Sequence, residues 1–430
     1  MKKSKKVRNQ KRYTNKSRNK NKRNIAKIRS QKVNVHTEPT QALSGKVIGS
    51  GTYGCVFKPP IKCNNSKGNS KGNSKGNSNG NSKGKKISKL MLLEEAESEY
   101  YKHQKIKKIL KQIKNSKDYF LFSDSLCLPK DLPSKLSARD KKSLDESCES
   151  ERITESYNED GFSDLAMLTM EDGGLDLQNY IFYHANEPGH KSAVLIKEVV
   201  KHLHDLLVNA IIPMNKLNVY HTDIKPSNIV VRTNKTKIQH FKLIDWGLSK
   251  INIPDNQRFS FFIHFNFPYE SLLFGLSENY TSFSNLNLDI KNIIKEDTED
   301  ILSDHIIKDI TLLFGTPDTI YTKKMVIDLL TNYLLSIARQ CYDEKKGFFD
   351  HNILTKNYYC KLDLWGFMIC FIDLYKVYGA TTNDVIKSYL LNICHYITTY
   401  KYDKSGKLDM KWINAWSNKI QELYKIEIKE

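Results

Sequence analysis

The chain has 430 residues, of which 39% are hydrophobic, and a formal net charge of +20 at pH 7. This length and apolar content exclude a wholly disordered polymer and suit one two-lobed domain or two smaller ones. Residues 1–32 hold 15 of the 68 Lys and Arg and no Asp or Glu, which leaves 53 basic against 48 acidic residues elsewhere. We therefore expect a basic tail attached to a nearly neutral body.

The cysteines and apolar runs predict a reduced, intracellular protein, cytoplasmic or nuclear. The eight cysteines form no C-x-x-C pair and no zinc-like cluster. The basic start is not followed by the apolar segment of a secretory signal. The longest apolar run, 364–375, is too short to span a bilayer and includes Asp373, so we expect no membrane association.

The beginning of the chain predicts a tail, a hairpin and a loop. Residues 1–40 have little to bury and are expected to be disordered. Through residues 1–32, this tail is expected to bind nucleic acid or another polyanion without sequence preference. Residues 43–59 predict two strands around a glycine-rich turn, and 64–84, with a four-residue Lys-Gly-Asn-Ser repeat, predict a flexible low-complexity loop.

The next segments alternate between strand and helix patterns. Residues 87–93 and 165–170 predict strands, and 94–113 predict a helix between them. The Ser-, Asp- and Glu-rich stretch 116–163 predicts a loose insertion. Apolar residues at helical spacing between 195 and 210 predict a long helix that ends near Pro213.

Helical patterns dominate from residue 269 to the C-terminus, so the fold class is expected to be α+β. We expect a small β-rich N-terminal lobe over 41–174 and a helical C-terminal lobe over 175–430. A helical insertion is expected at about 271–355. The sequence predicts no particular oligomeric state.

A glycine-rich motif, G-x-G-x-x-G-x-V, lies within the predicted hairpin. Glycines let a backbone approach phosphate groups closely and point its N–H groups at them. The pattern alone also fits an ordinary hairpin turn. The candidate nucleotide-binding residues are Gly49, Ser50, Gly51, Thr52, Tyr53, Gly54 and Val56.

The segment from Tyr220 to Asn228 carries the strongest chemical signal. Asp223 can orient an attacking hydroxyl and accept its proton, and Asn228, five residues later, can hold a metal ion. Lys225 can neutralise charge on a transferring phosphoryl group. An ordinary polar loop would not need these three residue types at these offsets.

A third motif follows 22 residues after Asp223, where an apolar strand ends at Asp245-Trp246-Gly247. Alone, this is a common turn at the end of a strand. After the preceding motif, Asp245 is expected to bind Mg²⁺ and link it to nucleotide phosphates.

In this order, the motifs resemble the eukaryotic protein kinase family over most of residues 43–375. The resemblance implies two lobes, ATP and Mg²⁺ between them, and a protein substrate. It also implies that Lys89, rather than its competitors Lys85 and Lys86, contacts the α- and β-phosphates and pairs with Glu99, with Glu95 as the second choice. Met170 resembles the residue that gates the adenine pocket, and the segment from Glu171 to Gly174 the hinge.

Two further motifs extend the resemblance. Asp363-Leu364-Trp365-Gly366 resembles the start of the buried helix that anchors the catalytic loop, and Pro268-Tyr269-Glu270 stands where the family usually has Ala-Pro-Glu. Lys225-Pro226 favours serine/threonine over tyrosine specificity.

The chain also departs from the family pattern. Thr222 replaces the usual arginine before the catalytic aspartate, and Trp246 replaces phenylalanine. The threonine usually found shortly before the Pro-x-Glu is absent. Such divergence, with low-complexity loops, resembles kinases of large DNA viruses.

Three alternatives remain at this point. The His-x-Asp…Asn spacing is shared by small-molecule kinases of the aminoglycoside or choline type, although Lys225 and Gly247 favour a protein kinase. A pseudokinase is disfavoured because every position that handles phosphate or metal is filled. A kinase-fold scaffold that binds nucleic acid through its tail is the third, although Tyr13 is the only aromatic residue there.

Overall fold

The structure is a computed structural model that describes residues 45–51, 53–64, 86–185, 192–234, 237–253, 265–296, 304–315, 321–403 and 405–427. All of them belong to one compact unit, Ser44–Glu430. The predicted basic tail, Thr52 and the Lys-Gly-Asn-Ser repeat lie outside the described residues, so the predictions made for them stay predictions.

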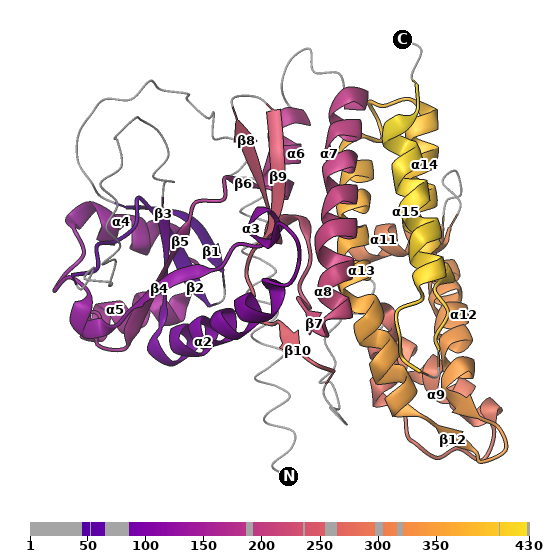
Figure 1. Ribbon diagram of the computed structural model, residues 1–430. Helices are drawn as coiled ribbons and strands as arrows, with labels where there is room; N and C mark the ends of the chain where they lie inside the picture. The colour runs from indigo at the N-terminus through magenta and orange to yellow at the C-terminus, as the bar shows by residue number, and fades with distance from the viewer. Residues whose placement is uncertain are drawn as a thin grey trace. The chain divides into compact units, whose positions relative to one another are not determined.

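The N-terminal part of this unit is a five-stranded antiparallel sheet with the strand order β1-β2-β3-β5-β4 (Figure 1). Side chains alternate between its two faces. Leu90 packs with α4 and α5 on one face, whereas Met91 packs with α2 on the other. The elements are β1 (Lys46–Gly51), β2 (Gly54–Lys58), β3 (Lys86–Leu92), α2 (Leu93–Leu110), β4 (Ser123–Cys127), α4 (Ala138–Ser147), α5 (Glu151–Asp160) and β5 (Leu165–Glu171).

The expectation of a loose insertion at 116–163 is wrong. This stretch supplies β4 at an edge of the sheet, α4 and α5, and two short turns, α3 (Ser116–Tyr119) and η1 (Pro129–Asp131). Leu144 and Ile153 are buried in the same core as β1 and β2, which explains how a polar segment becomes ordered. Phe120, by contrast, packs into the core of the helical part.

Four of the eight cysteines form disulfides, contrary to the expectation of a reduced protein. Cys55 of β2 pairs with Cys148 after α4, with the Cα atoms 5.6 Å apart, and Cys63 pairs with Cys127 of β4 at 6.0 Å. The first bond joins the β1–β2 hairpin to the 116–163 segment, and the second joins the stretch after β2 to it. The free thiols are all buried and belong to Cys341, Cys360, Cys370 and Cys394.

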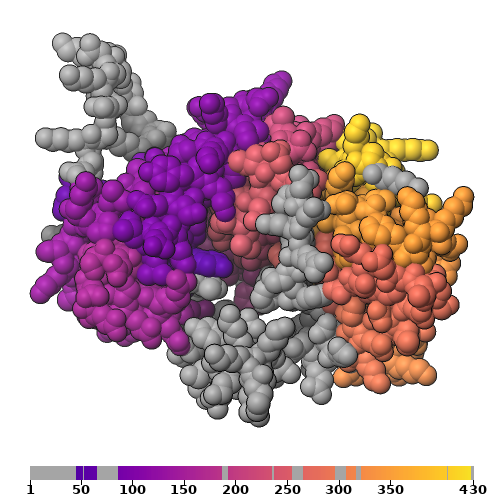
Figure 2. All heavy atoms as spheres, turned by 90° about the horizontal axis from the view of Figure 1, so that it is seen from below, coloured from indigo at the N-terminus to yellow at the C-terminus, as the bar shows by residue number. Residues whose placement is uncertain are grey.

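The C-terminal part is mostly helical and confirms the α+β expectation of a β-rich beginning followed by helices (Figure 1). A small sheet, β6-β8-β9, lies at its start. Figure 2 shows these salmon-coloured central residues between the violet N-terminal part and the orange to yellow C-terminal helices. Among the described helices, none is both long and apolar enough to cross a membrane.

The remaining elements are as follows. The strands are β6 (Leu175–Asp176), β7 (Val219–Tyr220), β8 (Ile229–Asn234), β9 (Lys237–Leu243), β10 (Lys250–Ile251), β11 (Tyr342–Asp343) and β12 (Phe348–Phe349). The helices are α6 (Leu177–Ala185), α7 (Ser192–Leu206), α8 (Ile212–Lys216), α9 (Phe283–Glu296), α11 (Asp304–Phe314), α12 (Lys323–Cys341), α13 (His351–Tyr378), α14 (Asp384–Tyr396) and α15 (Met410–Lys425). Short turns are η2 (Leu207–Ile211), η3 (Pro226–Asn228), η4 (Tyr269–Gly275) and η5 (Ile397–Thr399).

The long helix expected over 195–210 is present as α7, but Pro213 does not end it. The chain continues through a π-helical turn, η2, and Pro213 lies in the first turn of α8. Proline is tolerated there because the first N–H groups of a helix have no partner within the helix.

Helix α13 is the central element of the helical part. Every residue from 357 to 372 is buried, including Lys361 and Asp363. A helix that is apolar on all sides must be surrounded by others. Helices α6, α12 and α14, together with η4, contact it.

A buried ion pair attaches the expected insertion, 271–355, to this helix. The ammonium of Lys361 donates to Glu270 Oε1 at 2.6 Å and to the hydroxyl of Tyr333 on α12, which in turn donates to Glu270. Lys361 and Glu270 are both fully buried. Burial lowers the pKa of Lys361, against the opposing effect of Glu270. The Pro-x-Glu motif, α12 and α13 therefore meet at one polar contact.

We predict that Lys361→Met lowers the free energy of unfolding by about 3–5 kcal/mol, because it leaves a buried carboxylate without its cation. Chemical denaturation monitored by far-UV circular dichroism measures this change. The exposed pair of Lys346 with Asp343 provides the control, since Lys346→Met should change stability by less than about 0.5 kcal/mol. Equal effects of the two variants would contradict the prediction, and Lys361→Met/Glu270→Gln should recover much of the loss.

Candidate active site

The segment around Asp223 is fixed by the buried carboxylate of Asp363. Asp363 Oδ1 accepts from the backbone N–H of Thr222 at 2.8 Å. Its Oδ2 accepts from the backbone N–H of His221 at 2.9 Å and from Asn215 Nδ2 at 2.8 Å. Burial raises the pKa of Asp363, while His221 and these hydrogen bonds oppose the rise. Three donors on one carboxylate leave the loop little freedom.

One helical turn away, Gly366 allows the same loop to lie against α13. A Cβ atom at Gly366 would come within 2.3 Å of the carbonyl oxygen of Ile224. Only glycine permits this approach. The spacing of aspartate and glycine in the Asp-Leu-Trp-Gly motif therefore has a direct structural reason.

Three side chains donate to the carboxylate of Asp223, two from the loop and one from the segment before Pro268. Lys225 Nζ contacts Oδ1 and Oδ2 at 3.1 and 2.8 Å. Asn228 Nδ2 donates to Oδ2 and to the backbone carbonyl of Asp223, both at 2.8 Å. Asn266 Nδ2 donates to Oδ1 at 2.8 Å and to the carbonyl of Ile224 at 3.2 Å. Asp223, Lys225 and Asn228, which the sequence singled out, therefore lie together.

Asn266 is a residue that the sequence reasoning missed. It is 1% exposed and stands two positions before Pro268, near the place where the family threonine is absent. Nothing in the sequence indicated that this asparagine would contact Asp223.

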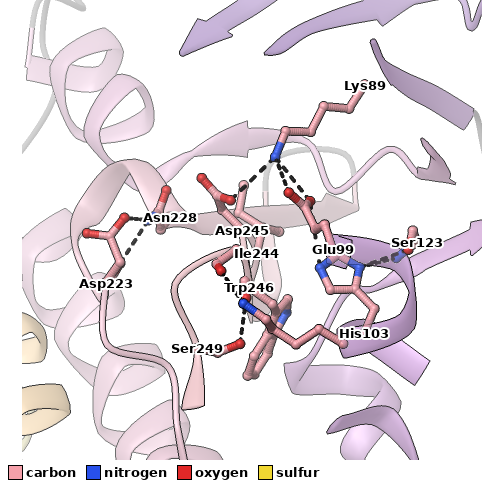
Figure 3. A network of polar contacts seen from close by, with 12 residues as sticks. Lys89, Glu99, His103, Ser123, Asp223, Asn228, Ile244, Asp245, Trp246 and Ser249 are labelled. Atoms are coloured by element: carbon pink, nitrogen blue, oxygen red, sulfur yellow. Dashed lines mark hydrogen bonds and ion pairs between the residues drawn. The ribbon is translucent and has the colours of Figure 1, made fainter. Parts of the chain in front are cut away.

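Asp245, Lys89 and Glu99 form the second half of the site (Figure 3). Lys89 Nζ lies 3.1 and 3.0 Å from the two carboxylate oxygens of Glu99 and 3.5 Å from Asp245 Oδ1. Burial alone would lower the pKa of Lys89, but the charges of Asp245 and Glu99 outweigh it and raise the pKa. Partial desolvation raises the pKa of Asp245, and Lys89, with other nearby cations, outweighs this and lowers it.

The structure also separates the sequence candidates for this pair. Glu95, the second choice, instead forms an ion pair with Arg152 at 2.7 Å on the surface. Lys86 lies 3.4 Å from Asp124, and its side chain is 53% exposed. Lys89 and Glu99 are therefore the buried pair.

Asn228 and Asp245 lie beside each other in Figure 3. Because Asn228 Nδ2 is engaged by Asp223, its amide oxygen is directed away from that residue. Among the described residues, no group of three or more His, Cys, Asp and Glu could hold a metal ion. The pair fits Mg²⁺, which typically takes one or two protein ligands and completes its coordination with phosphate oxygens and water.

Trp246 connects this half of the site to the sheet and to the loop that carries Asp223. It is fully buried, and its Nε1 donates to the carbonyl of Leu121 at 3.0 Å. Its ring stacks on Phe122 at 4.8 Å and lies 4.7 Å from the His221 ring. Beside Phe122, burial lowers the pKa of His103 to about 3, so that this histidine is neutral at physiological pH.

Thr222, which replaces the family arginine, has a structural partner. Its hydroxyl donates to the carbonyl of Leu248 at 2.8 Å. The β10 residues Lys250 and Ile251 pair with β7, and the hydroxyl of Ser249 donates to Trp246. The segment after Asp245 is thus held to the loop by uncharged hydrogen bonds.

The glycine-rich motif occupies the β1–β2 hairpin, where Gly51 pairs with Gly54. A Cβ at Gly54 would lie 2.5 Å from the carbonyl oxygen of Leu90, so glycine is required there, whereas Gly51 has open space around it. Val56 pairs with Lys89 in the ladder, which places the hairpin beside the Lys89–Glu99 pair. Other motif members described are Gly49, Ser50 and Tyr53, the last 50% exposed.

Met170 and Glu171 end β5. Glu171 forms ion pairs with Arg232 of β8 and, at 3.6 Å, with Lys242 of β9. The chain then passes so close to β8 that a Cβ at Gly173 would lie 2.4 Å from Val230. Glu171 therefore joins the five-stranded sheet to the small sheet through its side chain.

Cavities do not define this site. One of about 330 Å³ lies between α11, α14 and α15, and its lining includes His395 and Lys419 but no carboxylate. Another of about 260 Å³ is lined by residues that include Lys356 and Lys407. The candidate site is instead identified by its convergent charged side chains, of which Lys89, Glu99 and Asp245 have the shifted pKa values typical of functional sites.

We predict that Asp363→Ala destabilises the protein by about 3–5 kcal/mol, since it leaves buried donors of the loop unsatisfied. Thermal unfolding and amide hydrogen exchange measure the effect, and exchange at residues 221 and 222 should accelerate most. Asp373, on the same helix, provides the control. Asp373→Ala should leave exchange at 221 and 222 unchanged, and equal acceleration in both variants would contradict the role given to Asp363.

No family model matches the chain, and no curated protein sequence shows significant similarity to it. The geometry of these side chains is therefore the basis for assigning a function.

Proposed function

We propose that the protein is an ATP- and Mg²⁺-dependent phosphotransferase of the protein kinase type, acting on serine or threonine hydroxyls of a protein substrate. The observation that carries the proposal is the position of Lys89, which contacts Glu99 and Asp245 together. This arrangement links the sheet, α2 and the segment after β9 at one cation. A lysine so placed is suited to bind nucleotide phosphates.

Bound ATP would supply the phosphoryl group, and Mg²⁺ would balance its charge. Lys89 is held in its ammonium form by two carboxylates and keeps its orientation through Glu99. Asp245 and Asn228 would hold the metal. The hairpin glycines would present N–H groups to the phosphates.

Asp223 is suited to orient the acceptor hydroxyl and take its proton. Each of its carboxylate oxygens already accepts two hydrogen bonds, from Lys225 and Asn266 on Oδ1 and from Lys225 and Asn228 on Oδ2. An acceptor hydroxyl therefore requires one donor to leave. Lys225 is the one suited to do so, because its flexible ammonium can move to the developing phosphoryl charge while the two amides keep the carboxylate oriented.

The chain segment that supplies Asn266 favours a protein substrate over a small alcohol. The segment that contains it leads directly into Pro268-Tyr269-Glu270, which the buried Lys361 fixes to α13. Asp223 is thus braced by the segment that leads into this Pro-x-Glu motif, which resembles the corresponding motif of protein kinases. Offering the enzyme both generic proteins and a panel of small alcohols tests this preference.

We predict that Asp223→Asn and Asp245→Asn each lower kcat by about 10²–10⁴-fold while the protein stays folded. Lys89→Ala should lower kcat/KM by about 10²–10³-fold, because it removes a preorganised cation from the phosphates. Transfer of label from γ-labelled ATP measures all three. Lys86→Ala is the matched control on the same strand and should remain near normal. Wild-type turnover in Asp245→Asn would refute the proposed function.

We further predict that activity does not require phosphorylation of the segment after Asp245. Thr222 has no charge to receive a phosphate, and Ser249 is 2% exposed with its hydroxyl donated to Trp246. Phosphatase-treated and untreated enzyme should therefore have equal kcat. Thr222→Val removes one hydrogen bond to Leu248 worth about 1 kcal/mol and should lower kcat about fivefold, whereas Thr222→Ser should not. Loss of most activity after phosphatase treatment would contradict this prediction.

A further inference from the structure

Strand β1 is an edge strand, but its outer edge is covered. It pairs only with β2 in the described sheet. The backbone N–H of Val47 on its outer side donates to Ser143 Oγ of α4 at 2.9 Å, and Leu144 of the same helix is buried beside it. Helix α4 therefore covers an edge strand and supplies a hydrogen-bond partner to its outward backbone N–H.

The same helix end is joined covalently to the other strand of the hairpin. Cys148, immediately after α4, forms the disulfide with Cys55 of β2. Cys55 is fully buried and pairs with Ser50 of β1 within the glycine motif. The covalent bond therefore lies at the base of the glycine-rich turn.

A hydrogen bond reaches the glycine motif itself. The backbone N–H of Glu149 donates to Ser50 Oγ at 2.6 Å, and Ser50 Oγ lies 3.4 Å from Cys55 Sγ. Ser50 stands between Gly49 and Gly51, two glycines that by themselves impose little conformational restriction. Three contacts from one segment thus converge on a hairpin whose glycine composition alone would leave it mobile.

We propose that Ser143, Cys148 and Glu149, here called the clamp, are positioning residues for nucleotide binding that act through the β1–β2 hairpin. This inference rests on the proposed function and adds a determinant of ATP affinity to it. A hairpin held in one conformation before binding loses less conformational entropy when it closes on phosphates. Breaking the clamp should therefore weaken ATP binding without altering the groups that perform the transfer.

The disulfide also makes this affinity sensitive to dithiols. A dithiol reductant gives up two electrons and two protons and becomes a disulfide, while Cys55 and Cys148 become two thiols. The contact of Glu149 with Ser50 then depends on hydrogen bonding and packing alone. A reduced enzyme should bind ATP less tightly than an oxidised one.

The test measures the Kd for Mg–ATP by calorimetry, and KM for ATP and kcat by label transfer, in the full chain. For Cys148→Ser we expect Kd and KM to rise about three- to tenfold with kcat nearly unchanged. Wild-type enzyme treated with dithiothreitol should show the same rise, and treatment of Cys148→Ser should add nothing further.

Cys127→Ser is the matched control, because it removes the second disulfide from the same sheet without touching the hairpin. Its KM for ATP should equal that of the wild type and should still rise with dithiothreitol. Ser143→Ala keeps both disulfides and should raise KM by a smaller factor, which tests the clamp in a protein whose covalent bonds are intact.

The outcomes separate this inference from the proposed function. If oxidised wild type binds ATP and transfers phosphate, but Cys148→Ser and dithiothreitol leave its KM unchanged, the clamp is refuted and the function stands. Equal increases of KM in Cys148→Ser and Cys127→Ser would also refute it, since the effect would then be general destabilisation. If oxidised wild type binds no ATP, both proposals fail.

Discussion

The buried carboxylate of Asp363 is the constraint on which the candidate site depends. A fully buried aspartate must have its oxygens satisfied, and here the donors are the backbone of His221 and Thr222 and the side chain of Asn215. The loop cannot move without leaving that carboxylate unpaired in the interior. This contact therefore determines the positions of Asp223 and the residues that follow it.

A second set of contacts, made by uncharged donors, joins other segments around the site. Thr222 binds the carbonyl of Leu248, Asn266 binds Asp223, and Trp246 binds Leu121. Each donor is uncharged, and its hydrogen bond forms without phosphorylation. By contrast, Glu171, Lys89 and Lys361 use ion pairs, and these join separate elements to one another. Neutral and charged contacts therefore both shape the site, since Lys225 also contacts Asp223, and ion pairs connect the elements that carry it.

The sequence predicted the parts of the site whose residues lie close together along the chain. Asp223, Lys225 and Asn228 share a short loop, so fixed offsets sufficed to place them around one carboxylate. Lys89 and Glu99 were also predicted, because a strand followed directly by a helix limits which residues can meet.

Contacts between distant segments could not be predicted in the same way. Cys55 and Cys148 are 93 residues apart, and no sequence spacing indicates which cysteines pair. The segment 116–163 reads as polar because most of its surface faces water, and a few buried residues such as Leu144 and Ile153 suffice to order it. Pro213 was misplaced because a proline can begin a helical turn as well as end one.

The indole of Trp246 has a consequence for the discovery of inhibitors. Its ring fills a space bounded by Phe120, Phe122 and His221, and its N–H is satisfied by a carbonyl of a distant segment. A compound that binds by displacing this ring must compensate for lost aromatic packing and for a broken buried hydrogen bond, together about 2–4 kcal/mol. That amount corresponds to a weakening of roughly 30- to 1,000-fold. Chemical libraries directed at this protein should therefore favour scaffolds that leave the tryptophan in place.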